Sequence, residues 1–280
     1  MKIHIIIAFL ALLSVSAFGQ KNPEIKVASY NLRMDTPRDS MNAWPHRKEN
    51  VKALIQYHDF DIIGTQEGFI HQLNDLLGMP GFAFVGAGRD DGKTAGEHSA
   101  IFYKTDRFEL LDSGNFWLSE TPDKPGLGWD ATCCNRIASW ALLKDRKSKK
   151  EFYVFNAHFD HQGVIARKES GKLMIRKIKE IAKNKPVICT GDFNSTPDTE
   201  QMIALSAFLN DAYTITEMPP YGPVGTTNAF RFTAPMKNRI DYVFVSEHFK
   251  VLKYAVLTDA REQRYPSDHL PVVAAVQFAK

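Results

Sequence analysis

Five short apolar runs of this 280-residue chain each end in a carboxylate, an amide or an imidazole, and a sixth polar cluster precedes the last apolar run. The runs have the length and residue content of β-strands. In open α/β sheets, ligands bind beyond the carboxyl ends of the strands, where residues from distant parts of a sequence converge. Because a charged group is costly to bury without a partner, its recurrence at strand ends favours one shared site. The polar residues at these positions are Asn31, Glu67, Asn156, His158, Asp160, Asp192, Asn194, Asp241, Asp268 and His269.

The rest of the chain alternates β-rich runs with a few helical stretches. Pro45 stands in the first turn of a predicted helix that continues through Val51, Leu54 and Ile55 at helical spacing. A longer helix is predicted over residues 163–184, with one apolar and one basic face. The predicted strands are 25–32, 60–67, 82–85, 99–103, 136–143, 152–157, 187–190, 240–245 and 271–278.

The composition is that of a globular protein. Hydrophobic residues make up 44% and charged residues 24%, which excludes a disordered chain, a collagen-like repeat and a disulfide-dense small protein. No internal repeat, low-complexity stretch or linker rich in Pro, Gly or Ser divides the chain. The sequence therefore predicts one α/β domain over residues 20–280. The formal net charge of +3 is too small to indicate strong nucleic-acid binding by itself.

The first 19 residues have the pattern of a signal peptide. Lys2 supplies a positive start, residues 5–13 form an unbroken apolar run, and Ala17 and Gly19 are small residues before a cut at Gln20. A buried N-terminal strand or helix is the alternative. The run is far shorter than the ~20 residues of a membrane-spanning helix, and no later segment comes near that length. We therefore expect no transmembrane segment and an exported protein, periplasmic or extracellular, with a formal charge of +2 once Lys2 is removed.

The three cysteines indicate neither a disulfide framework nor a zinc site. Cys133 and Cys134 are neighbours, and because a bond between neighbours needs a strained ring, we expect none there. Cys189 lies in an apolar run and is expected to be a small core residue. No C-x-x-C or H-x-x-x-H spacing accompanies these residues, which argues against zinc.

The motifs at the strand ends resemble those of the endonuclease/exonuclease/phosphatase superfamily. This deoxyribonuclease I-like group includes abasic-site endonucleases, deadenylases, neutral sphingomyelinases and inositol-polyphosphate 5-phosphatases. The resemblance covers nearly all of residues 24–278 in the family's order, and it implies a four-layer sandwich of two mixed β-sheets packed face to face with helices outside. The motifs are SYN ending at Asn31, TQE ending at Glu67, NAH ending at His158, GDFNSTP over 191–197, RIDYVFVS around Asp241 and SDHLPV around Asp268 and His269.

The resemblance implies a metal site made of oxygen ligands. Glu67 matches the family's main metal ligand, and Asn31 and Asp268 would complete the metal shell or hold its waters. Such hard donors suit Mg²⁺ or Mn²⁺, one of which is the expected cofactor. The residues alone leave two alternatives open, an exposed loop carboxylate at Glu67 and a turn residue at Asn31.

The resemblance also implies roles in catalysis for the residues that follow the later strands. Asp192 matches the residue that orients or deprotonates the attacking water, and Asn194 would fix water and phosphate beside it. An Asx turn before residues 195–197 is the structural alternative, and both could hold. His269 matches an imidazole that contacts the scissile phosphate, and Asp241 matches the carboxylate that keeps this ring oriented and protonated.

Three further residues are implied at the phosphate. His158 matches the family's second histidine, Glu97 lies where some members carry its carboxylate partner, and Arg136 resembles an arginine that contacts phosphate with its planar fork. Abasic-site endonucleases carry an acid where this chain has Arg33, and a tyrosine where it has His158. Both departures argue against abasic-site repair.

Together these features predict an exported, metal-dependent phosphoesterase that hydrolyses a phosphodiester or phosphomonoester by in-line attack of an activated water. A nuclease acting on extracellular single-stranded nucleic acid is one alternative, and a secreted, catalytically inactive binding protein on the same fold is another. The expected partner is a small or single-stranded phosphoester, without strong duplex DNA binding, and we expect a monomer. Substrate specificity is expected in the loops 34–42, 87–96, 118–134 and 219–232, whose aromatic residues include Trp129, Tyr221, Phe230 and Phe232.

Overall fold

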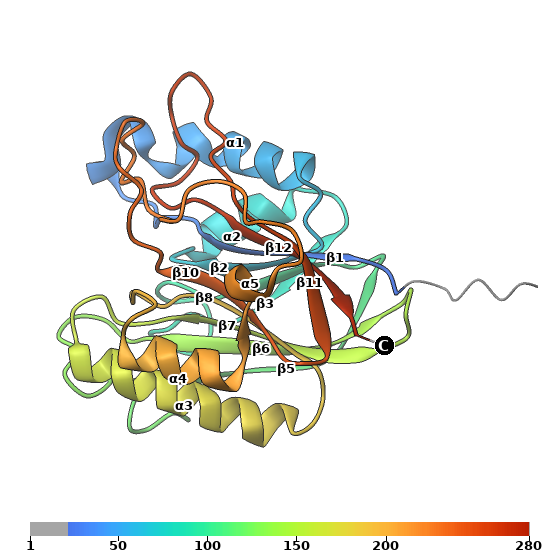
Figure 1. The fold of residues 1–280 in the computed structure, drawn as a ribbon. Coiled ribbons are helices and arrows are strands. Elements are labelled where there is room, and N and C mark those ends of the chain that lie inside the picture. Colours follow the sequence, from blue (N-terminus) through green and yellow to red (C-terminus); the bar gives the residue numbers. More distant parts are fainter. Residues whose placement is uncertain (1–21, 280) are drawn as a thin grey trace, which may run out of the picture.

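The computed structural model describes residues 22–279, which form two mixed six-stranded sheets packed face to face (Figure 1). The predicted signal peptide, residues 1–19, lies outside the described residues. The first sheet has the order β11-β12-β1-β2-β4-β3 and the second the order β5-β6-β7-β8-β10-β9. The strands are β1 (Ile25–Asn31), β2 (Ile62–Gln66), β3 (Phe82–Val85), β4 (Ile101–Lys104), β5 (Phe108–Trp117), β6 (Ile137–Asp145), β7 (Glu151–His158), β8 (Val187–Asp192), β9 (Asn210–Asp211), β10 (Asp241–Val245), β11 (Phe249–Val256) and β12 (Val272–Phe278).

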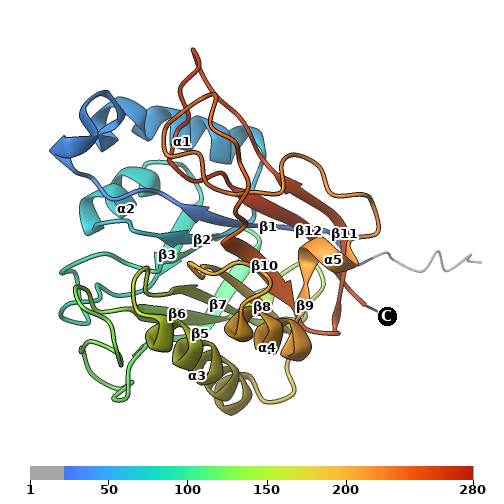
Figure 2. The same ribbon diagram turned by 60° about the vertical axis from the view of Figure 1, so that its left-hand side comes forward.

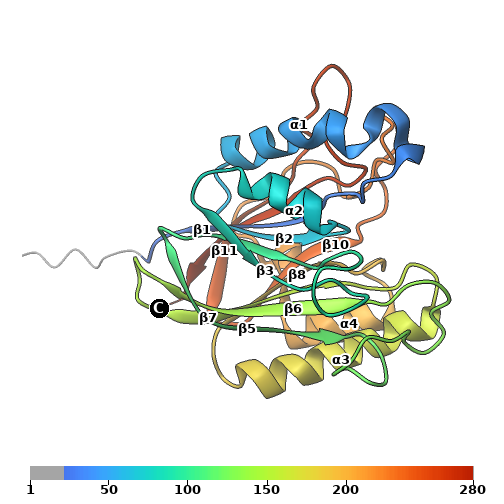
Figure 3. The same ribbon diagram turned by 180° about the vertical axis from the view of Figure 1, so that it is seen from behind.

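Helices cover the two outer faces of this pair of sheets. In Figures 2 and 3, α1 (Trp44–Tyr57) and α2 (Ile70–Leu77) lie over the first sheet, and α3 (Val164–Ala182) and α4 (Glu200–Phe208) lie over the second. A 3-10 helix, η1 (Pro37–Asn42), precedes α1, and the short α5 (Ala212–Ile215) follows β9. The predicted four-layer sandwich is confirmed.

Three apolar clusters correspond to the three interfaces between the layers. The central cluster joins the inner faces of the sheets, with Val27 and Ile62 from the first and Phe152 and Ile188 from the second, all fully buried. A second cluster lies between the first sheet and α1 and α2, and a third between the second sheet and α3 and α4. Strands that are apolar on both faces are thus explained by burial on both sides.

The longest elements that the sequence analysis did not predict are two strands, β5 and β11, and two helices, α2 and α4, and the short β9, α5 and η1 were not predicted either. Both strands lie at sheet edges, and most of β5 is exposed, so its side chains lack a clear apolar period. Both helices are short, with eight residues in α2 and nine in α4. Short length explains the omission of both helices, and exposure explains the omission of β5.

The strand register places the polar strand ends at one edge of the sandwich. Parallel pairing of β1 with β2 sets Asn31 opposite Gln66, one residue before Glu67. Parallel pairing of β7 with β8 sets His158 opposite Asp192, and antiparallel pairing of β8 with β10 sets Asp192 opposite Asp241. The ends of β1, β2, β7 and β8 and the start of β10 therefore meet, and a hydrogen bond from Asn31 to Asp192 joins the two sheets there.

A buried polar clamp joins the two sheets through Asn156, which the sequence analysis had placed among the strand-end polar residues. Its Oδ1 accepts hydrogen bonds from Gln66 Nε2 at 2.7 Å and Thr190 Oγ1 at 3.0 Å. Its Nδ2 donates to the carbonyl oxygens of Thr65 and Ala100. Gly64 makes room for the clamp, because a Cβ there would overlap Thr190 Oγ1 and come within 2.6 Å of Asn156 Oδ1. Asn156 thus holds the sheets together.

The structure corrects one expectation about the cysteines, since Cys133 and Cys134 form a disulfide. They lie in a segment without helix or strand, whose backbone is not committed to a ladder of hydrogen bonds. Cys189 is a free, buried thiol, as expected. Among residues 22–279, no helix has both the length and the apolar character required to cross a membrane.

Candidate active site

Asn31 lies at the centre of a group of carboxylates at the ends of β1, β2 and β8. Its Nδ2 donates to Glu67 Oε1 and to Asp192 Oδ2, each at 3.0 Å, and its Oδ1 accepts from the backbone N–H of Arg33 at 2.9 Å. Asn31 therefore makes the turn that the sequence analysis considered, and it also lies beside Glu67. Although burial opposes it, the positive ring of His269 and the Asn31 hydrogen bond lower the pKa of Glu67.

Asp192 is almost fully buried and lies between two hydrogen-bonded neighbours. Oδ2 faces Asn31, and Oδ1 accepts from the backbone N–H of Asn194 at 3.0 Å, which makes the predicted Asx turn. Burial, and after it the charge of Asp241, raise the pKa of Asp192 to about 7. Asn194 has a positive φ of 46°, and its Nδ2 donates to the carbonyl oxygen of Phe159. The turn thus aims the Asp192 carboxylate and ties it to the end of β7.

His269 and Asp241 form a second pair beside Asp192. His269 Nδ1 lies 2.9 Å from Asp241 Oδ2, which also accepts from Thr226 Oγ1 at 2.6 Å. His269 Nε2 lies 3.9 Å from Asp192 Oδ2. Although burial favours the neutral ring, the carboxylates of Asp241 and Asp192 raise the pKa of His269 well above its ordinary value. The ring is therefore a cation held between two buried carboxylates.

His158 lies on the other side of Asp192 and contacts Arg136. Its Nε2 is 3.6 Å from Asp192 Oδ2, and Arg136 Nη1 is 3.1 Å from the ring nitrogens. Burial, and after it the charge of Arg136, lower the pKa of His158 well below its ordinary value. His158 is therefore neutral near pH 7, in contrast with His269.

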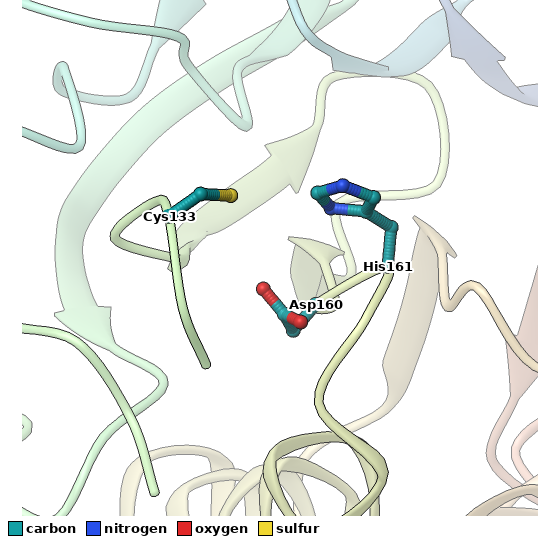
Figure 4. A group of neighbouring side chains, drawn as sticks. All are labelled: Cys133, Asp160 and His161. Atoms are coloured by element: carbon teal, nitrogen blue, oxygen red, sulfur yellow. The ribbon is translucent and has the colours of Figure 1, made fainter. Parts of the chain in front are cut away.

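Arg136 is buried and is held by two residues that directly follow the NAH motif. Its Nη2 donates to His161 Nδ1 at 2.7 Å, and its Nε lies 3.4 Å from Asp160 Oδ2. Figure 4 shows Asp160 and His161 turned toward Cys133. One ligand atom from each of these three residues lies within 4.8 Å of the others, but the Cys133 sulfur is bonded to Cys134. The geometry therefore assigns Asp160 and His161 to the positioning of Arg136.

Glu97 completes this side of the site. Its Oε2 accepts from Arg89 Nη1 at 2.6 Å and lies 3.8 Å from His158 Nδ1. Burial raises the pKa of Glu97 to about 7, although the charge of Arg89 opposes the shift. Glu97 thus neighbours His158, as the resemblance implied, and its main partner is Arg89.

Asp268 is fixed by the loop that precedes β10. Ser267 Oγ donates to the carbonyl oxygen of Asn31 at 2.7 Å. Asn228 donates two hydrogen bonds to the same segment, from Nδ2 to the Ser267 carbonyl oxygen at 3.0 Å and from its backbone N–H to the Asp268 carbonyl oxygen at 2.8 Å. Burial raises the pKa of Asp268, against the charge of His269. The segment 219–232, expected to set specificity, therefore also builds the site.

The acidic side of the site fits a divalent cation. Among residues 22–279, the ion pairs of Glu67 and Asp268 with arginine are long, at 4.0 and 3.8 Å, and both are made with Arg33. Ligand atoms of Glu67, His158 and Asp192 also lie within 4.8 Å of one another. Neighbouring carboxylate oxygens that no cation of the described residues contacts within hydrogen-bond distance are the donors that Mg²⁺ and Mn²⁺ prefer.

The structure brings all ten predicted site residues to one edge of the sandwich, and four more surround them without having been assigned a role. Asp160 and His161 could have been found from their place after NAH, because they end the same strand-like run. Arg89 lies in a loop of mixed charge, and Arg33 had been noted only as a departure from abasic-site endonucleases. Neither has a local pattern that marks it.

Comparison with known proteins agrees with this geometry. A profile of the endonuclease/exonuclease/phosphatase family matches residues 28–269. A structure of a family protein from Bacteroides thetaiotaomicron is 44% identical, with a TM-score of 0.89, and covers 93% of this chain and 100% of that one. A mannosyl-6-phosphatase from the same organism is 45% identical, with a TM-score of 0.86, and covers 91% and 100%. Nocturnin of Drosophila melanogaster is 26% identical over 278 residues, and this match covers 82% of the chain but only 41% of nocturnin.

Proposed function

Since the chain belongs to the endonuclease/exonuclease/phosphatase family, we propose that it is an exported, divalent-metal-dependent phosphatase that hydrolyses a phosphate monoester of a small molecule, such as a hexose phosphate. Phosphoester hydrolysis is the chemistry of this family. The choice of a monoester is supported by the likeness to the bacterial mannosyl-6-phosphatase, which extends over 91% of this chain at 45% identity. Export is supported by the pattern of residues 1–19.

The observation that carries the proposal is the placement of Asp192 beside two histidines, one neutral and one cationic. Asp192 Oδ2 lies 3.6 Å from the neutral His158 and 3.9 Å from the cationic His269. A carboxylate whose pKa is about 7 is matched to taking a proton from water near neutral pH. The surrounding rings and Arg136 are matched to a phosphoryl group, which carries negative charge.

The residues suggest a division of work during in-line attack. Asp192 accepts the proton of the attacking water, whose oxygen forms the new bond to phosphorus. His269, kept protonated by Asp241, donates a hydrogen bond to a phosphoryl oxygen, and Arg136 donates another from a position set by Asp160 and His161.

Glu67, Asn31 and Asp268 would hold the cation. Bound there, Mg²⁺ or Mn²⁺ would supply positive charge against the phosphoryl oxygens. Asn31 donates a hydrogen bond to both Glu67 and Asp192 and so separates the two carboxylates. Glu67 would then bind the cation, and Asp192 would bind the attacking water.

The test is a substrate panel with the full chain from residue 20 onward, in Mg²⁺ and in EDTA. The panel contains mannose 6-phosphate, glucose 6-phosphate, bis(4-nitrophenyl) phosphate and single-stranded oligonucleotides. We expect phosphate release from at least one monoester, its loss in EDTA, and its loss in Asp192→Asn but not in Asp198→Asn, an exposed aspartate of the following turn. Cleavage of oligonucleotides without hydrolysis of any monoester would favour the nuclease instead.

A further inference from the structure

Arg33 has a backbone conformation that the surrounding structure enforces. Its φ is +56°, in the left-handed region that is unfavourable for a residue other than glycine. Its N–H donates to Asn31 Oδ1 at 2.9 Å. Its carbonyl oxygen accepts from Gln72 Nε2 at 2.9 Å and from Arg47 Nη2 at 2.6 Å. Gln72 and Arg47 are both buried, so the position of the Arg33 backbone, from which its side chain extends, is fixed.

The Arg33 guanidinium is fixed as well, by Asp39. Nε donates to Asp39 Oδ2 at 2.8 Å, and Nη2 donates to Oδ1 at 3.0 Å. Asp39 belongs to η1, which begins at Pro37 and whose first turn is capped by the Thr36 side chain. Within the part of the chain that the structure describes, Nη1 donates no hydrogen bond. It faces Glu67 Oε2 at 4.0 Å and Asp268 Oδ2 at 3.8 Å.

The Arg33 guanidinium and Asp192 are linked to different oxygens of Glu67. Glu67 Oε1 accepts a hydrogen bond from Asn31, which also donates to Asp192. Glu67 Oε2 accepts from the backbone N–H of Met34 and faces Arg33. In an in-line displacement the attacking and leaving oxygens are on opposite sides of phosphorus. Taking Asp192 as the base on the side of the water, we assign Nη1 of Arg33, which faces Glu67 Oε2 and Asp268 Oδ2, to the side of the leaving oxygen.

We propose that Arg33 is a catalytic residue that stabilises the leaving group, by donating from Nη1 to the oxygen that departs from phosphorus. The inference rests on the proposed function, because it takes Asp192 as the base. As water attacks, its proton passes to Asp192 and the bond from phosphorus to the leaving oxygen breaks. The electron pair of that bond stays on the leaving oxygen. Because a guanidinium does not release a proton in the accessible pH range, Arg33 offsets the new negative charge and solvent supplies the proton.

This role predicts a dependence on the basicity of the leaving oxygen. The alkoxide that leaves a hexose 6-phosphate is strongly basic and needs stabilisation, whereas the nitrophenolate that leaves 4-nitrophenyl phosphate is weakly basic. Removal of one donor that stabilises developing charge costs on the order of 100-fold in rate. We therefore expect Arg33→Ala to lower kcat on the hexose phosphate about 100-fold and on 4-nitrophenyl phosphate less than about 5-fold.

Asp39 acts through Arg33 and is a positioning residue. Asp39→Asn should show the same preference for the aryl phosphate with a smaller loss, and Asp39→Glu should recover part of the hexose phosphate activity. Arg38→Ala is the matched control, since Arg38 is an exposed arginine of the same η1 segment. Melting curves would establish that each variant folds.

The experiment measures kcat and KM of the wild type and these variants on the two monoesters in Mg²⁺. A loss in Arg33→Ala confined to the hexose phosphate supports the proposal. Equal losses on both substrates, no loss on either, or a change in KM alone would overturn it while leaving the phosphatase in place. A wild type that hydrolyses neither monoester would overturn the proposed function and the role of Arg33 together.

Discussion

His269 Nδ1 lies 2.9 Å from Asp241 Oδ2, and this pairing favours the cationic form of one of the two histidines of the site. The other, His158, contacts Arg136 and stays neutral. Two imidazoles on either side of Asp192 thus differ in charge because their partners differ in charge. The active-site chemistry depends on these partners as much as on the rings.

The first prediction separates chemistry from folding. Asp192→Asn and His269→Ala should each lower turnover of the monoester by about 100-fold or more, because one removes the base and the other the cation at the phosphoryl group. Circular dichroism melts should show no large loss of stability in Asp192→Asn, whereas His269→Ala should melt at a lower temperature because it leaves the buried Asp241 carboxylate without its charged partner, so turnover is compared below both melting temperatures. Near-normal turnover in both variants would reject the assignment of this site.

The second prediction concerns the cation. Calorimetric titration with Mg²⁺ or Mn²⁺ should show binding to the wild type that is lost in Glu67→Gln and in Asp268→Asn, because each variant removes a charged oxygen ligand. Glu49→Gln, at an exposed position of α1, serves as the control. Full activity after dialysis against EDTA, or a tightly held stoichiometric zinc, would contradict the site.

The third prediction uses the opposite pKa shifts of the two histidines. The pKa of His158 is lowered in the folded state, so below about pH 6.5 the unfolded chain binds a proton there that the folded chain does not, and stability falls as pH falls. The pKa of His269 is raised, so its contribution is complete below about pH 6.5 and is lost as pH rises toward its folded pKa.

Urea unfolding in EDTA at pH 5.5, 6.5 and 8.5 would check this pattern. Between pH 6.5 and 5.5 the free energy of unfolding should decrease less in His158→Gln than in the wild type. Between pH 6.5 and 8.5 it should decrease less in His269→Gln than in the wild type. Each effect is at most about 1.4 kcal/mol per pH unit. His46→Gln, at an exposed position, should follow the wild-type curve. Identical curves for all four proteins would refute the assigned charge states.

The fourth prediction addresses the clamp beneath the site. Gly64→Ala should lower the free energy of unfolding by ~1–3 kcal/mol, because its Cβ would overlap Thr190 Oγ1. In Gly64→Ala/Thr190→Ala the loss should be smaller than the sum of the single losses, since the second change removes the overlapping atom. Gly126→Ala meets only Thr121 Oγ1, at 3.7 Å, and should be nearly neutral. Additive losses in the double variant would show that the clamp adapts.

The fifth prediction concerns nucleic acid. The Lys and Arg residues of α3 are spaced along a solvated face, and the formal net charge of the sequence is only +3. We expect Asp192→Asn protein to bind duplex DNA weakly at physiological salt. A duplex binder would show a slope of about −0.9 per phosphate contact in log affinity against log salt. Submicromolar binding with a slope that implies six or more contacts would identify α3 as a docking surface.

The fold class was predictable from the sequence because it depends on local patterns, and the same patterns mark the polar strand ends that the structure brings together, whereas Arg136 and Glu97 were expected only from the family resemblance. A strand that is buried on both faces is apolar along its length whatever its neighbours, and a polar residue that ends it stands out against this run. The family's motifs add the identity of the residues, as in the GDFN of β8. The edge strands β5 and β11 are only partly buried, so their apolar residues do not form a continuous run, and the sequence analysis did not predict them.

What only the tertiary structure decided are the partners that set charge and orientation. Arg33 and Asp39 are six residues apart, yet their pairing depends on a backbone fixed by Arg47 and Gln72 from two helices. His158 is neutral and His269 is cationic because of Arg136 and Asp241, which are distant from the two histidines in the sequence. Such contacts come from register and long-range packing, and sequence periodicity does not encode them, because it records only which side of its own strand or helix a residue faces.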